Sequence, residues 1–346
     1  MTGGGRVATM PAMSVTPKSE TTPSTSRAGM RPVVLLGPQR LQPTVRRAAD
    51  TLDLDGPIAL ITAGWEEREA EDQELADHLG RQTVNLELFA RTERVFDEDP
   101  ELYEALMQRK DRLAALQGIY RMRLDHALEA ARALFKRTDE AEVLIPERQH
   151  ALDAVAALDA HHLSRVREIE TAFRERWKPL EREALAKQRE EVHARLDECS
   201  AVAIAGGHVM VLLNRFRLYA LMPKLTEFPV LAWAAGAMVL TERIVAFHDS
   251  PPQGRGNPEV LEAGVGLVPG VVVLPHARQR LKLTDPVRVA LLARRFAPAR
   301  CLAFDADCEA WWVDWRLRPG GGLRELRSQG DVLTLTPASD VGTRRP

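Results

Sequence analysis

The chain has 346 residues, of which 45% are hydrophobic and 28% are charged, and its formal net charge is only −2. This composition is that of a globular protein, and it excludes a collagen-like fibre, a wholly disordered chain and a small disulfide scaffold. The near balance of charge also argues against a nucleic-acid-binding protein, because no overall basic field would attract the phosphate backbone.

The first part of the chain, residues 1–30, is rich in Thr, Ser, Pro and Gly and holds no apolar run that could form a signal-peptide core. We predict a disordered tail there. The longest apolar stretches, 228–240 and 264–275, fall short of the roughly 18 residues needed to span a bilayer, so no membrane segment is expected. The three cysteines are odd in number and lack metal-ligand spacing, which favours a cytoplasmic location and no metal site.

Short apolar runs followed by helix-like segments open the regular part of the chain. Residues 33–37 form the first run, and a helical pattern follows from about 43 to 54. A second run at 58–62 precedes a charged amphipathic helix expected over 66–79 and a strand expected over 84–89. Two such units in succession predict a parallel sheet.

The composition changes between residues 97 and 198 to Ala, Leu, Glu, Arg and Lys, which predicts a long helical insert. Pro146 is the expected break between two antiparallel helices, and Pro179 a further kink. One helix carries an apolar stripe that needs a cover, formed by Leu102, Leu106, Leu113, Leu116, Tyr120, Leu124 and Leu128. We expect the hairpin to pack on the rest of the chain, to bind a partner protein or to form a homodimer; a purely structural arm is the alternative.

The strand and helix pattern resumes after the insert. Strands are expected at 201–205, 230–233, 244–247, 270–274, 301–304, 311–313 and 332–335, with a helix at 286–296. Residues 31–96 and 199–340 should therefore form a single α/β domain, a mostly parallel sheet flanked by helices, from which the helical hairpin insert projects.

Two strand-to-helix turns of small residues lie where such sheets form their sites, at the carboxyl ends of strands. One contains Gly206 and Gly207, and the other is Ala234-Ala235-Gly236-Ala237. A nucleophile elbow needs small residues around a strained central residue, and the second turn has this steric pattern.

The chain contains, in order, the segments IAGGHVMVLLNRFRLYAL, LAWAAGAMVL and LVPGVVVLPHARQRL. Together they resemble the motifs of the dipeptidase E and cyanophycinase family of serine peptidases, in the class I glutamine amidotransferase-like superfamily. The resemblance covers most of residues 33–89 and 200–310 and leaves out the insert. It implies a flavodoxin-like fold and, for active members, a serine nucleophile.

The resemblance implies a role for each matching residue. Gly206, Gly207 and Ala235 would supply the N–H groups of an oxyanion hole, and His276 would be the general base. The nucleophile position falls on Ala234, which has no hydroxyl or thiol, so the acyl-enzyme route cannot begin there. The loss of the nucleophile is stronger evidence about function than the matches at the other positions.

An acid between the elbow and the histidine would orient His276. Asp249 is the candidate by its place along the chain, with Glu242 and Glu262 as weaker ones. Without a serine to activate, His276 is equally well explained as a helix cap or a core residue.

Further residues around the two turns would line a pocket: His208, Trp233 and Gly236. His208 stands where the family has a smaller or polar residue, and it would fill the pocket or contact a ligand. Hydroxyls that could replace the missing nucleophile belong to Thr241 and Ser250, but neither occupies the exposed turn.

Two functions from different classes follow. The first is a catalytically degenerate protein of this superfamily that binds a small molecule or peptide, or another protein. The alternative is an active hydrolase of small peptides or amides with a non-standard nucleophile. No Walker loop, no GxGxxG after a strand and no Cys/His cluster is found, so no cofactor is expected.

Overall fold

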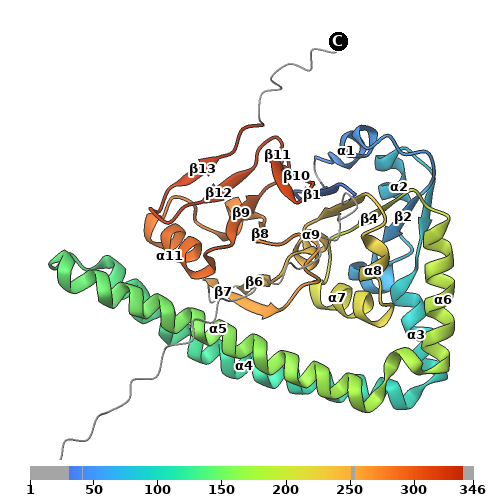
Figure 1. Cartoon of the computed structure of the whole chain (residues 1–346), viewed down its shortest axis with the longest axis horizontal. Coiled ribbons are helices and arrows are strands. Elements are labelled where there is room, and N and C mark those ends of the chain that lie inside the picture. Colours follow the sequence, from blue (N-terminus) through green and yellow to red (C-terminus); the bar gives the residue numbers. More distant parts are fainter. Residues whose placement is uncertain (1–30, 41, 251–253, 338–346) are drawn as a thin grey trace, which may run out of the picture.

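The computed structural model describes residues 31–40, 42–250 and 254–337, and leaves the side chains of 248–250 and 254–256 undescribed. Its central element is a seven-stranded sheet with helices on both faces (Figure 1). The strand order is β11 (Arg316–Pro319), β10 (Glu309–Val313), β1 (Val33–Leu36), β5 (Val230–Trp233), β4 (Ala201–Ile204), β2 (Ile58–Ile61) and β3 (Thr83–Asn85). The five strands from β1 to β3 are parallel, which confirms the expected α/β fold. The tail at 1–30 lies outside the described residues.

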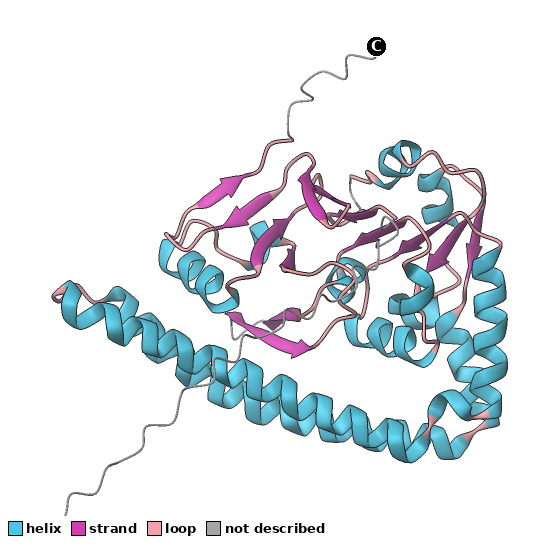
Figure 2. Cartoon of the chain, in the orientation of Figure 1, coloured by secondary structure: helices cyan, strands magenta, loops and turns pink. Residues whose placement is uncertain are grey.

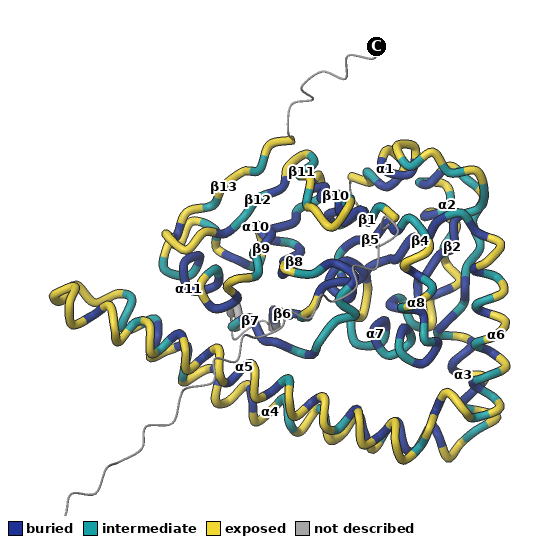
Figure 3. The backbone as a smooth tube through the Cα atoms, in the orientation of Figure 1, coloured by how far each residue is buried: buried dark blue, intermediate teal, exposed yellow. Residues whose placement is uncertain are grey.

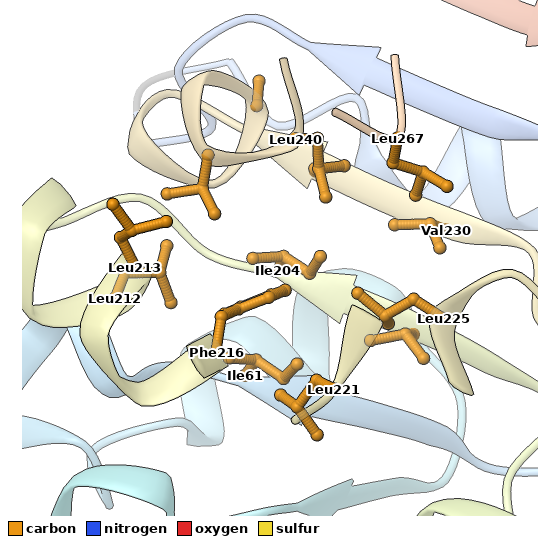
Figure 4. Close-up of a cluster of buried hydrophobic side chains, with 14 of the residues drawn as sticks. Ile61, Ile204, Leu212, Leu213, Phe216, Leu221, Leu225, Val230, Leu240 and Leu267 are labelled. Atoms are coloured by element: carbon orange, nitrogen blue, oxygen red, sulfur yellow. The ribbon is translucent and has the colours of Figure 1, made fainter. Parts of the chain in front are cut away.

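Both faces of the parallel strands are buried, as the unbroken apolar runs require. On one face, the strands pack against α1 (Val45–Thr51) and α2 (Gln73–Leu79). On the other face, Ile61 and Ile204 meet apolar side chains of α7 (Val209–Leu218), including Phe216 (Figure 4). The remaining helices of the body are α3 (Leu88–Glu98), α8 (Met222–Leu225), α9 (Ala235–Leu240), α10 (Ala277–Arg280) and α11 (Pro286–Phe296).

Of the strands that the structure describes after β5, only β10 and β11 join the central sheet. A four-stranded sheet has the order β13 (Val332–Thr334), β12 (Arg324–Leu326), β9 (Arg300–Phe304), β8 (Val271–Pro275), and β6 (Ile244–Ser250) pairs with β7 (Gly254–Glu262). The reason lies at β1, whose outer edge is taken by β10 in antiparallel register. The strand before His276 thus belongs to a different sheet from the elbow strand.

The single helix expected over 66–79 is wrong. A 3₁₀ helix, η1 (Ala63–Arg68), is kinked at Glu66, whose φ of 58° and ψ of −125° no helix allows, and α2 starts only at Gln73. The strand expected over 84–89 is also too long, because β3 ends at Asn85 and α3 starts at Leu88. The carboxylate of Glu69 accepts hydrogen bonds from two backbone N–H groups in the first turn of α3, which stabilises that helix start.

Residues 100–197 fold into α4 (Pro100–Lys136), α5 (Ala141–Trp177), the 3₁₀ turn η2 (Pro179–Glu181) and α6 (Glu183–Asp197). The two longest helices run antiparallel along one side of the body (Figure 2). Pro146 does not break the chain: it lies in the second turn of α5, and the reversal falls at 137–140. At this position the proline removes one hydrogen bond, the one that residue 146 would donate to the carbonyl of Glu142, and only the first turn of α5 precedes it. The kink expected at Pro179 is confirmed, since α5 ends at Trp177.

The body of the protein and the facing helix α5 cover most of the apolar stripe of α4. Leu102 and Leu106 join the core of the central sheet, whereas Tyr120, Leu124 and Leu128 pack with residues of α5, β6, β7, β8 and α11. Leu113 and Leu116 are half-buried. The exposed large apolar side chains of the hairpin are Tyr103, Ile119, Met122, Val143 and Ile145. The tip of the hairpin extends past α11 and is mostly exposed (Figure 3).

A buried ion pair joins this hairpin to the body. Arg295 of α11 donates to Asp159 of α5 at 2.7 Å, and both side chains are at most 5% exposed. Tyr120 of α4 donates to the same carboxylate at 2.7 Å, and its hydroxyl accepts from the backbone N–H of Val260. Arg295 also donates to the carbonyl of Pro258. The three helices and β7 are thus connected through one polar group of atoms in an apolar setting.

In the part of the chain that the structure describes, no helix is long and apolar enough to cross a membrane.

Candidate functional site

The turn after β5 has the backbone of a nucleophile elbow. Ala234 adopts φ 47° and ψ −117°, a conformation that L-residues rarely occupy, and α9 starts at the next residue. Gly236 cannot be larger, because a Cβ there would lie 2.4 Å from the carbonyl oxygen of Ile204. The small residues therefore serve a steric need: they let α9 lie directly on β4, and they leave Ala234 half-exposed at the end of the strand.

The glycine turn after β4 lies against this elbow. A Cβ on Gly206 would be 2.9 Å from the Cβ of Ala234, so the two turns are in direct contact. Gly207 has φ 121° and packs on Gly64, whose carbonyl accepts a 2.7 Å hydrogen bond from the N–H of His208. Three neighbouring strands, β2, β4 and β5, thus bring their carboxyl ends together at one edge of the sheet.

Ala235, to which the resemblance assigns an N–H of the oxyanion hole, is the first residue of α9 and directly follows Ala234. Its N–H has no acceptor inside the helix. The glycine turn lies close to it, since a Cβ on Gly206 would be 3.7 Å from the Ala235 nitrogen. The oxyanion hole stays a prediction.

The structure gives His208 and Trp233 definite places. His208 is exposed and caps α7, its Nδ1 accepting from the N–H of Val211 at 3.2 Å. Trp233 is 6% exposed and packs in the core between the central sheet and α1 and α2. His208 is therefore on the rim of the elbow, whereas the Trp233 ring is among core residues.

His276 follows β8, at the carboxyl end of the second sheet, with φ 56°. Because Pro275 and Phe304 are register partners in parallel strands, the next residues, His276 and Asp305, are neighbours at this end. The carbonyl oxygen of Asp305 would lie 1.7 Å from a Cβ on Gly37, so Asp305 is packed against the end of β1. β1 in turn pairs with the elbow strand in parallel register, so Gly37 and Ala234 are neighbours at the ends of β1 and β5.

The three acidic residues that the sequence offered as partners of His276 lie in different parts of the fold. Asp249 lies in β6 opposite Arg255, and its side chain is outside the described residues. Glu242 accepts from the N–H of Gly270 at 3.0 Å, and Glu262 is buried in an ion pair with Arg217. Both are engaged away from His276.

Sequence reasoning missed Asp305. Its side chain is 12% exposed, accepts from the N–H of Arg278 at 3.1 Å and forms an ion pair with Arg324. It directly follows the strand expected at 301–304, so the rule that sites form at the carboxyl ends of strands could have found it.

Other possible nucleophiles are hidden. Thr241 is fully buried, and its hydroxyl donates to the carbonyl of Met238 at 2.8 Å. All three cysteines are buried and unpaired; burial raises the pKa of Cys301 to about 12 and that of Cys308 to about 11, and it also raises the pKa of Cys199. Such thiols are poor nucleophiles. The side chain of Ser250 is outside the described residues.

Among the described residues, no three or more His, Cys, Asp and Glu side chains are grouped to hold a metal ion.

Comparison with protein-family models gives no match, and comparison with curated proteins gives none. Among solved structures, the chain is similar to a peptidase from an acI-B1 Actinobacterium, at 13% identity and a TM-score of 0.40. That alignment covers 89% of this chain and 98% of the other. So distant a likeness assigns no activity to this chain.

Proposed function

We propose that this chain is a catalytically degenerate relative of the dipeptidase E and cyanophycinase type of serine peptidase. In this proposal, the site at Ala234 binds a small molecule or a peptide without cleaving it. The observation that carries the proposal is an elbow backbone conformation at a residue without a nucleophilic atom. Strain of this kind costs about 1–3 kcal/mol and clusters at active sites and ligand-binding positions.

The close contact of the glycine turn with the elbow supports the same proposal. Gly206 leaves no room for a side chain between the two turns, since a Cβ there would lie 2.9 Å from the Ala234 methyl group. A ligand carbonyl placed over that methyl group would face the N–H of Ala235, as a substrate carbonyl does in an active elbow. Binding can therefore persist where acyl transfer cannot.

The alternative, an active hydrolase with another nucleophile, finds little support. The thiols are buried with raised pKa values, and the Thr241 hydroxyl is fully buried. Hydrolysis of Asp-X dipeptides by the wild type, by Ala234→Ser and by the double variant Ala234→Ser/His276→Ala separates the two functions. The proposal expects no turnover by the wild type, turnover by Ala234→Ser, and loss of that turnover in the double variant. Turnover by the wild type would favour the alternative.

The proposal includes the organisation of the chain. Residues 31–96 and 199–340 would act as one unit carrying the site, and 97–198 as an arm that binds a partner protein or a second copy. Most of the α4 stripe is buried, whereas Val143 and Ile145 at the arm's tip are 60% and 63% exposed and are the better candidates for that contact. Deletion of the arm would expose core residues, so the sharper test is light scattering on Val143→Ser/Ile145→Ser. A mass equal to that of the wild type would count against an assembly role for the tip.

A cytoplasmic location, suggested by the unpaired cysteines, is also part of this proposal.

A further inference from the structure

A hollow lined by charged side chains lies between the arm and the body, away from the elbow. It measures about 220 Å³, and it is lined by Arg132, Lys136, Lys282, Asp285, Val287 and Arg288. The first two residues belong to α4 and the others to the turn before α11 and to its first turn. Figure 1 shows α11 beside the outer part of the arm, where these elements meet. A water molecule needs roughly 10–15 Å³ of such space, so the hollow can hold an anion of several heavy atoms.

The lining is strongly cationic in a chain whose overall charge is close to zero. Four of the six side chains are Arg or Lys, and one is a carboxylate. That carboxylate, Asp285, is the N-cap of α11 and accepts from the N–H of Arg288 at 3.1 Å. In the described parts of the chain, neither Lys136 nor Lys282 has a carboxylate within ion-pair distance. Two ammonium groups are therefore available to a ligand.

The setting strengthens the attraction for an anion. Arg132 is half-buried, its guanidinium donates to the neutral side-chain amide of Asn257, and burial lowers its pKa. A smaller hollow of about 20 Å³ shares Arg132 and Arg288 with it and is otherwise lined by Leu128, Pro258, Leu291, Leu292 and Arg295. Because Arg132 and Arg288 are half-buried, water screens their attraction for an anion less than it screens that of the exposed Lys136 and Lys282. The amino end of α11, with Val287 in the wall, adds a favourable dipole.

We propose that this hollow binds a small anion with two or more phosphoryl groups, of which inorganic pyrophosphate is the simplest. Arginine forks and lysine ammonium groups are the usual partners of phosphate oxygens. Four cations and one carboxylate give the lining a net charge of +3, which exceeds the charge of about −2 on one phosphate group and favours a ligand with linked phosphates. The ligand would bridge α4 and α11 and hold the arm to the body. A nucleoside diphosphate offers the same chemistry from another source.

The test is isothermal titration calorimetry of the full chain with pyrophosphate, ADP and orthophosphate. The double variant Lys136→Gln/Lys282→Gln removes the two ammonium groups, and Lys110→Gln/Arg112→Gln makes the same charge change on an exposed part of α4. We expect pyrophosphate to bind the wild type and the Lys110/Arg112 variant alike, and to bind the Lys136/Lys282 variant at least tenfold more weakly. Equal circular dichroism and Tm values would show that each variant is folded.

The titrations also identify the source of the phosphates. Tighter binding of ADP than of pyrophosphate would support the site and point to a nucleotide, whereas the reverse order supports free linked phosphates. No heat of binding with either ligand at 1 mM would overturn the proposal. Equal weakening by the two double variants would also overturn it, because the effect would then be one of net charge only.

Discussion

Removal of one partner from the buried pair of Arg295 and Asp159 tests how the arm is attached. In Asp159→Ala, the guanidinium stays buried, at 1% exposure, with its carboxylate gone and only the Pro258 carbonyl and the Tyr120 hydroxyl as partners. Breaking a buried ion pair in this way costs about 3–5 kcal/mol. The Tyr120 hydroxyl loses its acceptor as well, which adds about 1 kcal/mol.

The same reasoning predicts a partial rescue. In Asp159→Leu/Arg295→Met, neither charge is left uncompensated, so the double variant should be more stable than Asp159→Ala by at least about 2 kcal/mol. Urea unfolding followed by circular dichroism measures these differences. A loss below about 1 kcal/mol in Asp159→Ala would refute the reasoning, as would a double variant less stable than the single one.

Three further predictions concern the elbow, the arm and the thiols. Gly236→Ala should destabilise the protein by more than about 2 kcal/mol, since its Cβ would meet backbone carbonyl oxygens of β4. The control Gly118→Ala, which has open space around its Cβ in α4, should stabilise the protein by about 0.5–1 kcal/mol. Urea unfolding compares the two variants, and equal effects would contradict the packing of α9. Ala234→Gly should raise the free energy of unfolding by about 1 kcal/mol by relieving a positive φ, and a loss of stability would argue against strain at the elbow. Cys301 and Cys308, with pKa values raised by burial to about 12 and about 11, should resist iodoacetamide at pH 8.5 until the protein unfolds; mass spectrometry would show any native-state alkylation, which contradicts their burial.

The sequence predicts those parts of the fold that depend on local pattern. The unbroken apolar runs of β1, β2, β4 and β5 indicate strands buried on both faces, and α11 matches its predicted range of 286–296. Sequence patterns do not predict a local structure that depends on a contact between segments far apart in the chain. The kink at Glu66 leaves no apolar signature, and Pro146 suggests a break that its place near a helix start makes unnecessary.

The candidate site shows the same division. The small residues around Ala234 and Gly206 reveal two sharp turns, and the structure places those turns in contact. The neighbour of His276 could not be read from chain order, because β8 pairs with β9 in a separate sheet and so brings Asp305 beside it. Which strands share a sheet is set by the antiparallel pairing of β10 with β1, a contact between the two ends of the chain.

Labelling with a fluorophosphonate probe tests whether the elbow lacks only its hydroxyl, because the probe reports an activated hydroxyl without requiring a known substrate. The wild type, Ala234→Ser and Ala234→Ser/His276→Ala would be treated in parallel and analysed by intact-mass spectrometry. We expect no labelling of the wild type, labelling of Ala234→Ser at residue 234, and its loss in the double variant. Labelling of the wild type would contradict catalytic degeneracy, and an unlabelled Ala234→Ser would contradict an intact elbow around a missing hydroxyl.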